Sequence, residues 1–184
     1  MKDLFIQAYQ DNIQREGADD LLKWLQQTDF FEAPASTRFH LSRYGGLVEH
    51  SINVWQRLCN QDVGNAETIA ICGLLHDVCK VGLYKTEMRN KKDEHGAWIQ
   101  VPYYTVDDQL PYGHGEKSVY IISGFLKLTR EESISIRWHM GGFDDAVKGG
   151  SYALSEAWRK YPLAVQLHIA DLQAAYIDDE RKTI

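Results

Sequence analysis

The chain has 184 residues, which is enough for one domain whose core forms without disulfides or structural metals. Its 20 basic and 26 acidic residues give a formal net charge of -6, which argues against a general binder of long nucleic acid and favours a small substrate or a short nucleic-acid end. Three cysteines without a C-x-x-C pair exclude a disulfide framework and are typical of a reducing cytoplasm, and no apolar run is long enough to span a membrane.

Helical periodicity dominates the first half of the chain. Apolar residues at helical spacing predict three helices, residues 4–15, 19–27 and 47–58. Pro34 and mixed polarity predict a loop over residues 30–44. The apolar run IAICGLL makes residues 65–80 a buried central helix, because a helix that is apolar all round needs neighbours on every side.

The pattern changes after residue 83. Residues 84–88 and 98–106 are predicted as strands, and the polar stretch NKKDEHG between them predicts a β-hairpin. Thr129 with Glu132 has the spacing of a capping box, and the segment GGFDDAVKGGS is predicted as a loop. Helical periodicity returns in four segments, residues 117–127, 130–140, 155–160 and 162–178. The sequence therefore predicts a single all-α domain, residues 1–184, with a small β-hairpin insertion.

The strongest chemical signal is the segment LLHDVCK, in which His76 and Asp77 are adjacent near the end of the buried helix. Imidazole and carboxylate together suit a first-row divalent metal, and a buried aspartate is costly unless something pairs with it. The alternative for the dipeptide alone is a capped helix end with a His–Asp hydrogen bond. The apolar residues before it, and Lys80 one helical turn after Asp77, favour a metal site.

With its neighbouring motifs, the chain resembles the HD superfamily of metal-dependent phosphohydrolases. The family pattern is one histidine, then an adjacent His-Asp pair, then a distant aspartate, each on a separate helix. Here GGLVEHS supplies His50, LLHDVCK supplies His76 and Asp77, and LHIADL supplies Asp171. The resemblance covers residues 39–175 and implies that these side chains bind one or two divalent ions of manganese, iron, nickel, zinc or magnesium.

Within the superfamily, the chain is most similar to the HD domains of bacterial 3′-to-5′ exoribonucleases. Their HH…GGLLEH, HHG and AD segments are similar to residues 40–50, 138–141 and 170–171. Leu41 stands where the second histidine of their first motif falls, and the sequence does not include their OB-like nucleic-acid-binding domain. Both departures concern the substrate that the resemblance implies, and neither concerns metal binding.

Two further histidines extend the candidate ligand set, His114 in YGHGEKS and His139 ahead of two glycines. In HD proteins with two metals, such as the HD-GYP cyclic-dinucleotide phosphodiesterases, two histidines in this order bind the second ion. By that resemblance Asp77 would contact both ions, and the first ion would also be bound by His50, His76 and Asp171. In the alternative, a single ion binds, and His114 and His139 line the pocket and contact phosphate.

Two other histidines have open roles. His40 matches the exoribonuclease motif and is either at the site or in a surface loop, and His168 is either a rival ligand to Asp171 or a core residue. The last histidine, His95, is expected to be solvated at the tip of the hairpin.

A divalent metal lowers the pKa of coordinated water towards neutrality and polarises a phosphoryl oxygen, which suits in-line attack on phosphorus. We expect Asp77 to orient the nucleophile or accept its proton. Lys80 is expected either to stabilise phosphate charge or to be a cation favoured at a helix C-terminus. Charge and nearness in sequence to the ligands suggest four phosphate contacts, Arg38, Arg43, Lys117 and Lys148.

Two loop segments are candidates for selecting the substrate. The loop that carries Asp144, Lys148 and Ser151 either closes over the substrate or is an ordinary connector. Tyr103 and Tyr104 either stack on a base or divide between core and surface.

Three functions remain open from the sequence. The first is a phosphohydrolase that cleaves a phosphomonoester or phosphodiester of a nucleotide or short nucleic-acid end. The second is an HD-fold di-iron oxygenase acting on a small polar substrate, and the third is an inactive nucleotide-binding domain. The complete ligand set makes the third the least favoured, whereas ligand identity alone does not separate the first two. The polar start MKDLFIQAYQ predicts no signal peptide, so we expect a cytoplasmic protein with a phosphate-bearing small molecule or short oligonucleotide as its partner, and no membrane.

Overall fold

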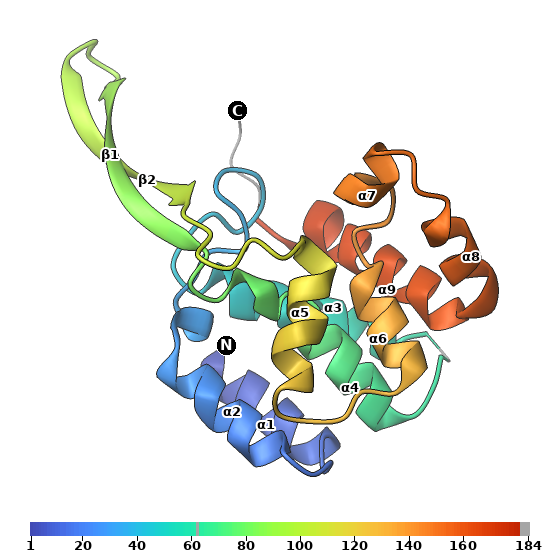
Figure 1. Cartoon of the computed structure of the whole chain (residues 1–184). Coiled ribbons are helices and arrows are strands. Elements are labelled where there is room, and N and C mark those ends of the chain that lie inside the picture. Colours follow the sequence, from blue (N-terminus) through green and yellow to red (C-terminus); the bar gives the residue numbers. More distant parts are fainter. Residues whose placement is uncertain (62, 181–184) are drawn as a thin grey trace.

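A bundle of α-helices with one projecting β-hairpin makes up the computed structural model, which describes residues 1–61 and 63–180 (Figure 1). The helices of the first half are α1 (Lys2–Asn12), α2 (Ala18–Gln27), α3 (Gly46–Cys59) and α4 (Ala66–Leu75). The second half contributes α5 (His114–Ser123), α6 (Arg130–Arg137), α7 (Asp145–Lys148), α8 (Ala153–Lys160) and α9 (Pro162–Gln173). The predicted all-α class with a small hairpin is confirmed.

The central helix is α4, as its apolar sequence predicts. Every residue from Thr68 to Leu75 is buried, and α4 contacts α1, α3 and α6. Gly73 allows the closest of these approaches, because a Cβ atom there would lie 2.6 Å from the Trp55 Cα of α3. The helix therefore ends deep in the molecule, and its last residues bring the His-Asp pair into the interior.

The hairpin consists of β1 (Tyr84–Lys92) and β2 (Trp98–Val106), paired antiparallel with Tyr84 opposite Val106 and Lys92 opposite Trp98. The prediction ended the first strand at residue 88, which is too early. The polar residues that follow were interpreted as loop, but the hairpin projects from the bundle, so polar side chains suit both of its faces (Figure 1).

In the second half, the start of α5 and the presence of α7 differ from the prediction, whereas the helical end at residue 178 and one capping box are confirmed. The helix predicted over residues 117–127 begins earlier, at His114, and the predicted loop over residues 141–151 contains α7. Asp144 starts α7 by accepting a hydrogen bond from the backbone N–H of Ala146. A π-helical turn, Ala174–Asp178, continues α9. The capping box of Thr129 and Glu132 at the start of α6 is present.

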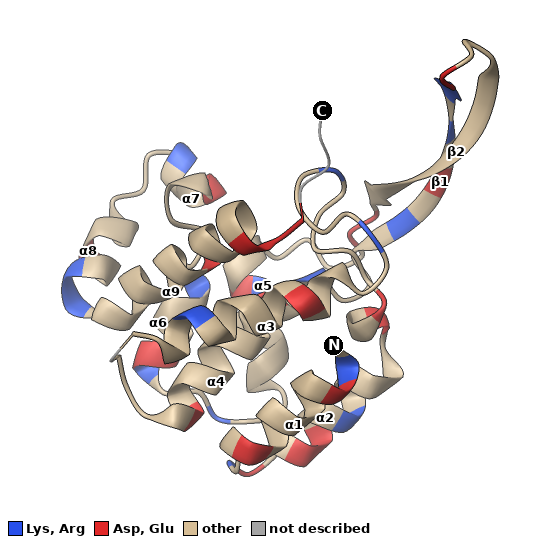
Figure 2. Ribbon diagram, turned by 180° about the vertical axis from the view of Figure 1, so that it is seen from behind, with Lys and Arg blue, Asp and Glu red and all other residues tan. Residues whose placement is uncertain are grey.

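Charged residues of both signs are interspersed along the helices (Figure 2). This mixed distribution agrees with the near balance of 20 basic and 26 acidic residues. In the part of the chain that the structure describes, no helix is both long and apolar enough to cross a membrane.

Candidate metal centre

The predicted ligands come from five helices and meet in the middle of the bundle. His50 lies on α3, His114 begins α5, His139 follows α6 by two residues, and Asp171 lies on α9. His76 is the C-cap of α4, and the chain leaves the helix at Asp77, with φ -104° and ψ 17°. This break in the helix lets two adjacent side chains face the same space, which a continuous helix would oppose.

The carboxylate of Asp77 lies between two pairs of imidazoles. Its Oδ2 is 3.6 Å from the Nε2 atoms of His50 and His76. Its Oδ1 is 2.8 Å from His114 Nε2 and 3.5 Å from His139 Nε2. Each oxygen therefore faces a different pair of nitrogen ligands, which is the arrangement needed for a carboxylate that contacts two cations.

Three groups of ligand atoms in this cluster are compact enough for a metal ion, since the atoms of each group lie within 4.8 Å of one another. The groups are His50 with His76 and Asp77, His76 with His139 and Asp171, and Asp77 with His114 and His139. Asp171 also reaches the first group, because its Oδ1 is 3.1 Å from His50 Nε2. The structure therefore brings all six predicted ligands together.

Hydrogen bonds at the outer edge of the cluster fix which ring nitrogen of each histidine faces inward. The Nδ1 atoms of His50, His76 and His139 each lie next to an acceptor, so each carries the proton. The acceptors are Asp179 Oδ2 at 2.8 Å, Gly73 O at 2.9 Å and Ile136 O at 2.7 Å. In the neutral rings, the unprotonated Nε2 lone pairs therefore point into the cluster, as metal binding requires.

The inward-facing Nε2 atoms are not all satisfied by protein partners. Among the described residues, the fully buried His139 Nε2 forms no hydrogen bond. The Nε2 atoms of His50 and His76 lie 3.3 Å apart, so two acceptors would face each other in the interior once both rings are neutral. Both features are costly in the protein alone and become favourable with a cation between the atoms. The residues present therefore fit a divalent metal.

Burial and neighbouring charges put part of the cluster in the ionisation state that a metal needs. Burial alone would raise the pKa of Asp77, but Lys80 and the nearby imidazoles hold it well below its usual range. Burial lowers the pKa of His76 to about 3, so this ring is neutral. In His50, burial also lowers the pKa, but Asp171 and Asp179 outweigh it and raise the value to about 9. In His114, burial again lowers the pKa, but Cys79 and Asp77 outweigh it and raise the value to about 10. A metal must therefore displace a proton from both His50 and His114.

A cavity of about 470 Å³ gives access to the cluster, and His50, Asp77, His114 and Asp171 line it. Lys80 also lines this cavity, with its Nζ 2.5 Å from Asp77 Oδ2. His76 and His139 lie beneath and are fully buried. The cavity therefore presents carboxylates, imidazoles and an ammonium group together.

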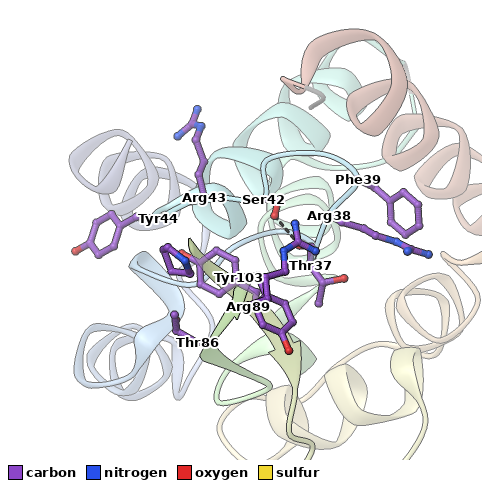
Figure 3. A pocket seen from close by; sticks show the side chains of 11 residues that line it. Thr37, Arg38, Phe39, Ser42, Arg43, Tyr44, Thr86, Arg89 and Tyr103 are labelled. Carbon is purple, nitrogen blue, oxygen red and sulfur yellow. Dashed lines mark hydrogen bonds between the residues drawn. The ribbon is translucent and has the colours of Figure 1, made fainter. Parts of the chain in front are cut away.

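The four predicted phosphate contacts lie in different places. Lys148 lines the cavity of the metal cluster, whereas Arg38 and Arg43 line a neighbouring cavity of about 670 Å³ (Figure 3). Lys117 lines neither of these, because its buried ammonium group lies 2.5 Å from Asp108 Oδ1. Nearness in sequence to a ligand thus did not determine which cavity a cation faces.

The remaining candidate residues differ from one another in where they lie and what they contact. Asp144 forms an ion pair with Arg137 at 2.7 Å in addition to starting α7, so it is a structural residue here. His168 lines the metal cavity and donates from Nδ1 to the backbone oxygen of His139, at 2.7 Å. His95 is exposed at the hairpin tip, as expected.

Sequence reasoning missed Asp179. Its buried carboxylate accepts hydrogen bonds from the Nδ1 atoms of His40, at 2.6 Å, and His50, at 2.8 Å, and from Asn53 Nδ2, at 2.7 Å. The run IDDE is typical of a solvated helix end, and nothing in it distinguishes Asp179 from Asp178. Asp179 comes directly after the π-helical turn that continues α9, and in the structure its side chain faces the interior.

The family model for the HD domain matches residues 47–178 of the chain. The matched segment includes all six predicted ligands, from His50 to Asp171, and ends one residue before Asp179. No curated protein and no solved structure matches the chain.

Proposed function

The chain belongs to the HD domain family, which suggests a metal-dependent hydrolase in general, and we propose that it hydrolyses a phosphoester of a nucleotide or of a short nucleic-acid end. We infer this substrate class from the sequence resemblance of residues 40–50 and 138–141 to the motifs of bacterial 3′-to-5′ exoribonucleases.

The observation that carries the proposal is the position of Asp77 between two imidazole pairs, next to a cavity that lysines line. His50, His76 and Asp171 would hold one ion, and His114 and His139 the other, with Asp77 facing both. In a chain of net charge -6, Lys80 and Lys148 at this cavity favour an anionic substrate over a neutral one.

Bound metal supplies Lewis acidity, which makes a water nucleophile available near neutral pH and offsets phosphoryl charge. The protein's own groups prepare the site for this chemistry. Lys80 keeps Asp77 ionised, and it lines the metal cavity with its Nζ 2.5 Å from Asp77 Oδ2, so it is our candidate to bind a phosphoryl oxygen. The Nδ1 hydrogen bonds hold the imidazoles of His50, His76 and His139 in a fixed orientation before any substrate arrives.

The test is metal analysis of the purified protein, combined with a phosphatase and phosphodiesterase screen over nucleotides and short oligonucleotides. We expect bound divalent metal and turnover, and we expect Asp77→Ala to reduce kcat by roughly a thousandfold or more because it removes the shared ligand. His95→Ala, at the exposed hairpin tip, is the matched control and should retain full activity.

Circular dichroism would establish that the Asp77→Ala variant is folded. A metal-loaded protein that hydrolyses none of these phosphoesters would contradict the proposal. A mixed-valent di-iron signal in electron paramagnetic resonance, together with oxidation of a small polar substrate, would identify an oxygenase in its place.

A further inference from the structure

A second cavity lies next to the metal cavity, between the loop of residues 37–44 and the β-hairpin (Figure 3). Its volume is about 670 Å³, within the range of small-molecule binding sites. Thr37 and Phe39 line both cavities, so the two adjoin. We call this second cavity the hairpin groove.

The hairpin groove is basic although the chain is acidic. Three arginines and no acidic residue line it, in a chain with a net charge of -6. Arg43 is engaged elsewhere, with Glu49 at 2.7 Å and Glu180 at 3.3 Å. Among the described residues, Arg38 and Arg89 form no ion pair, so their guanidinium groups are available to an anion.

Aromatic rings accompany these two guanidinium groups. Arg38 lies 5.0 Å from the ring centroid of Phe39, and Arg89 lies 5.2 Å from that of Tyr103. Phe39 is 49% exposed, and Tyr44 and Tyr104 add further rings to the lining. Planar aromatic and guanidinium groups bind unpaired bases by stacking, while free arginines bind the phosphates between them.

We propose that the hairpin groove binds the uncleaved nucleotides of a single-stranded oligonucleotide whose terminal phosphoester lies at the metal cluster. The identity of the cleaved end rests on the proposed function, whereas binding of the strand does not. An unpaired strand suits the groove better than a duplex, because stacked and paired bases do not expose their faces to Phe39, Tyr103 or Tyr104. The net charge of -6 would limit the strand to a short one.

Fluorescence anisotropy with the full chain tests this proposal. The probes are 5′-fluorescein oligoadenylates of two to about eight nucleotides, a range that single-strand sites occupy, with phosphorothioates at both terminal linkages to prevent cleavage. We expect affinity to rise about tenfold or more with length, as nucleotides fill the groove. An abasic strand of equal length should bind about tenfold more weakly, because it offers phosphates without stacking.

Two variants examine opposite walls of the groove. Arg89→Ala, on the hairpin, and Arg38→Ala, on the loop, should each weaken the binding of long probes about tenfold. Each should also lower the slope of log affinity against log salt by roughly 0.7, the loss of one phosphate contact. Lys23→Ala, which removes one exposed cation from α2, is the matched control and should bind as the wild type does. Because both arginines are exposed, circular dichroism should show unchanged folds.

Three results would overturn the inference: affinity that does not depend on length, arginine variants that bind like the wild type, or an abasic strand that binds as tightly as the oligoadenylate. The last would leave a general polyanion site. Length-dependent binding that needs Arg38 and Arg89, without hydrolysis of any phosphoester, would support the groove and contradict the proposed function. Hydrolysis of mononucleotides, together with a binding affinity that does not depend on strand length, would support the proposed function and contradict the groove.

Discussion

Asp179 illustrates how a residue outside the predicted ligand set controls a ligand. It accepts the Nδ1 proton of His50 and thereby directs the Nε2 atom of that ring towards Asp77 and Asp171. Asn53 holds the second carboxylate oxygen, Oδ1, at 2.7 Å, so the carboxylate has little freedom to rotate. Carboxylates that orient a ligating histidine in this way affect metal affinity strongly although they do not contact the ion.

Replacing Asp179 with asparagine should therefore weaken metal binding by about 10- to 100-fold, measured by competition with a chromophoric chelator. The neighbouring Asp178 offers a matched control, because it forms a surface ion pair with Arg57 at 2.6 Å. Asp178→Asn should leave metal affinity unchanged. Equal affinity of the Asp179→Asn variant and the wild type would show that His50 does not depend on this carboxylate.

At the residue scale, a candidate ligand could be predicted from the sequence when it lay in a recognisable motif. The role of a residue could not be predicted when it depended on a contact with a distant part of the chain. His76 and Asp77 were recognisable because an apolar run precedes them. Lys117 was expected at phosphate because of its charge and its nearness in sequence to the ligands, yet Asp108 binds its ammonium group. Such a pairing joins a loop to a helix and leaves no trace in local sequence.

Among the elements, α6 is joined to the N-terminal segment by the carboxylate of Glu132. This fully buried group accepts hydrogen bonds from Arg15 at 2.7 Å and from Thr68 Oγ1 of α4 at 2.8 Å, and it closes the capping box with Thr129. Burial alone would raise the pKa of Glu132, but the hydrogen bonds from Arg15, Thr129 and Thr68 outweigh burial and lower it. The ionised carboxylate therefore stabilises the fold.

Because the folded-state pKa of Glu132 lies below its unfolded value, its contribution is complete above the unfolded value near 4.5 and is lost as the pH falls through the folded value. Glu132→Gln should lower the free energy of unfolding at pH 7 by about 2–3 kcal/mol, measured by urea denaturation. The difference in stability between pH 7 and pH 4 should shrink in this variant. Glu131→Gln, at an exposed position, should change neither quantity.

Helices and strands could be predicted from the sequence where the spacing of apolar side chains matches the side that is buried, or where a local capping motif is present. The apolar run in α4 and the capping box of α6 are local features, and both were identified. Strand β1 was predicted too short because its last residues are polar, and α7 was missed because four helical residues between glycines show no period. In both cases the structure depends on pairing or capping, which hydrophobicity does not report.

On the scale of the whole molecule, the metal cluster joins helices from distant parts of the chain. His50 and Asp171 approach to 3.1 Å although they lie on α3 and α9. A cation bound by both, and by side chains from α4, α5 and α6, would oppose separation of the helices during unfolding.

Removing metal with a chelator should therefore lower the Tm, measured by differential scanning calorimetry. At a metal concentration of about 100 times Kd, the expected stabilisation is about 2.7 kcal/mol. For a chain of this size, that corresponds to roughly 5–10 °C. The shift should be absent in Asp77→Ala, which lacks the shared ligand. An identical Tm with and without saturating metal in the wild type would contradict metal binding within the bundle.

All six predicted ligands lie on or directly beside the helices, and the β-hairpin carries none of them. The hairpin joins the bundle at its base, where the N–H of Asp107 donates to Leu83 O at 2.8 Å. Two hairpin residues next to that bond, Tyr84 and Val106, line the metal cavity. Insertions, deletions or exchanges beyond this pair would alter the hairpin groove and leave the six predicted ligands in place. Under the proposed function, the preference for a substrate could therefore change during evolution, or by exchange of the distal hairpin, without redesign of the bundle interior.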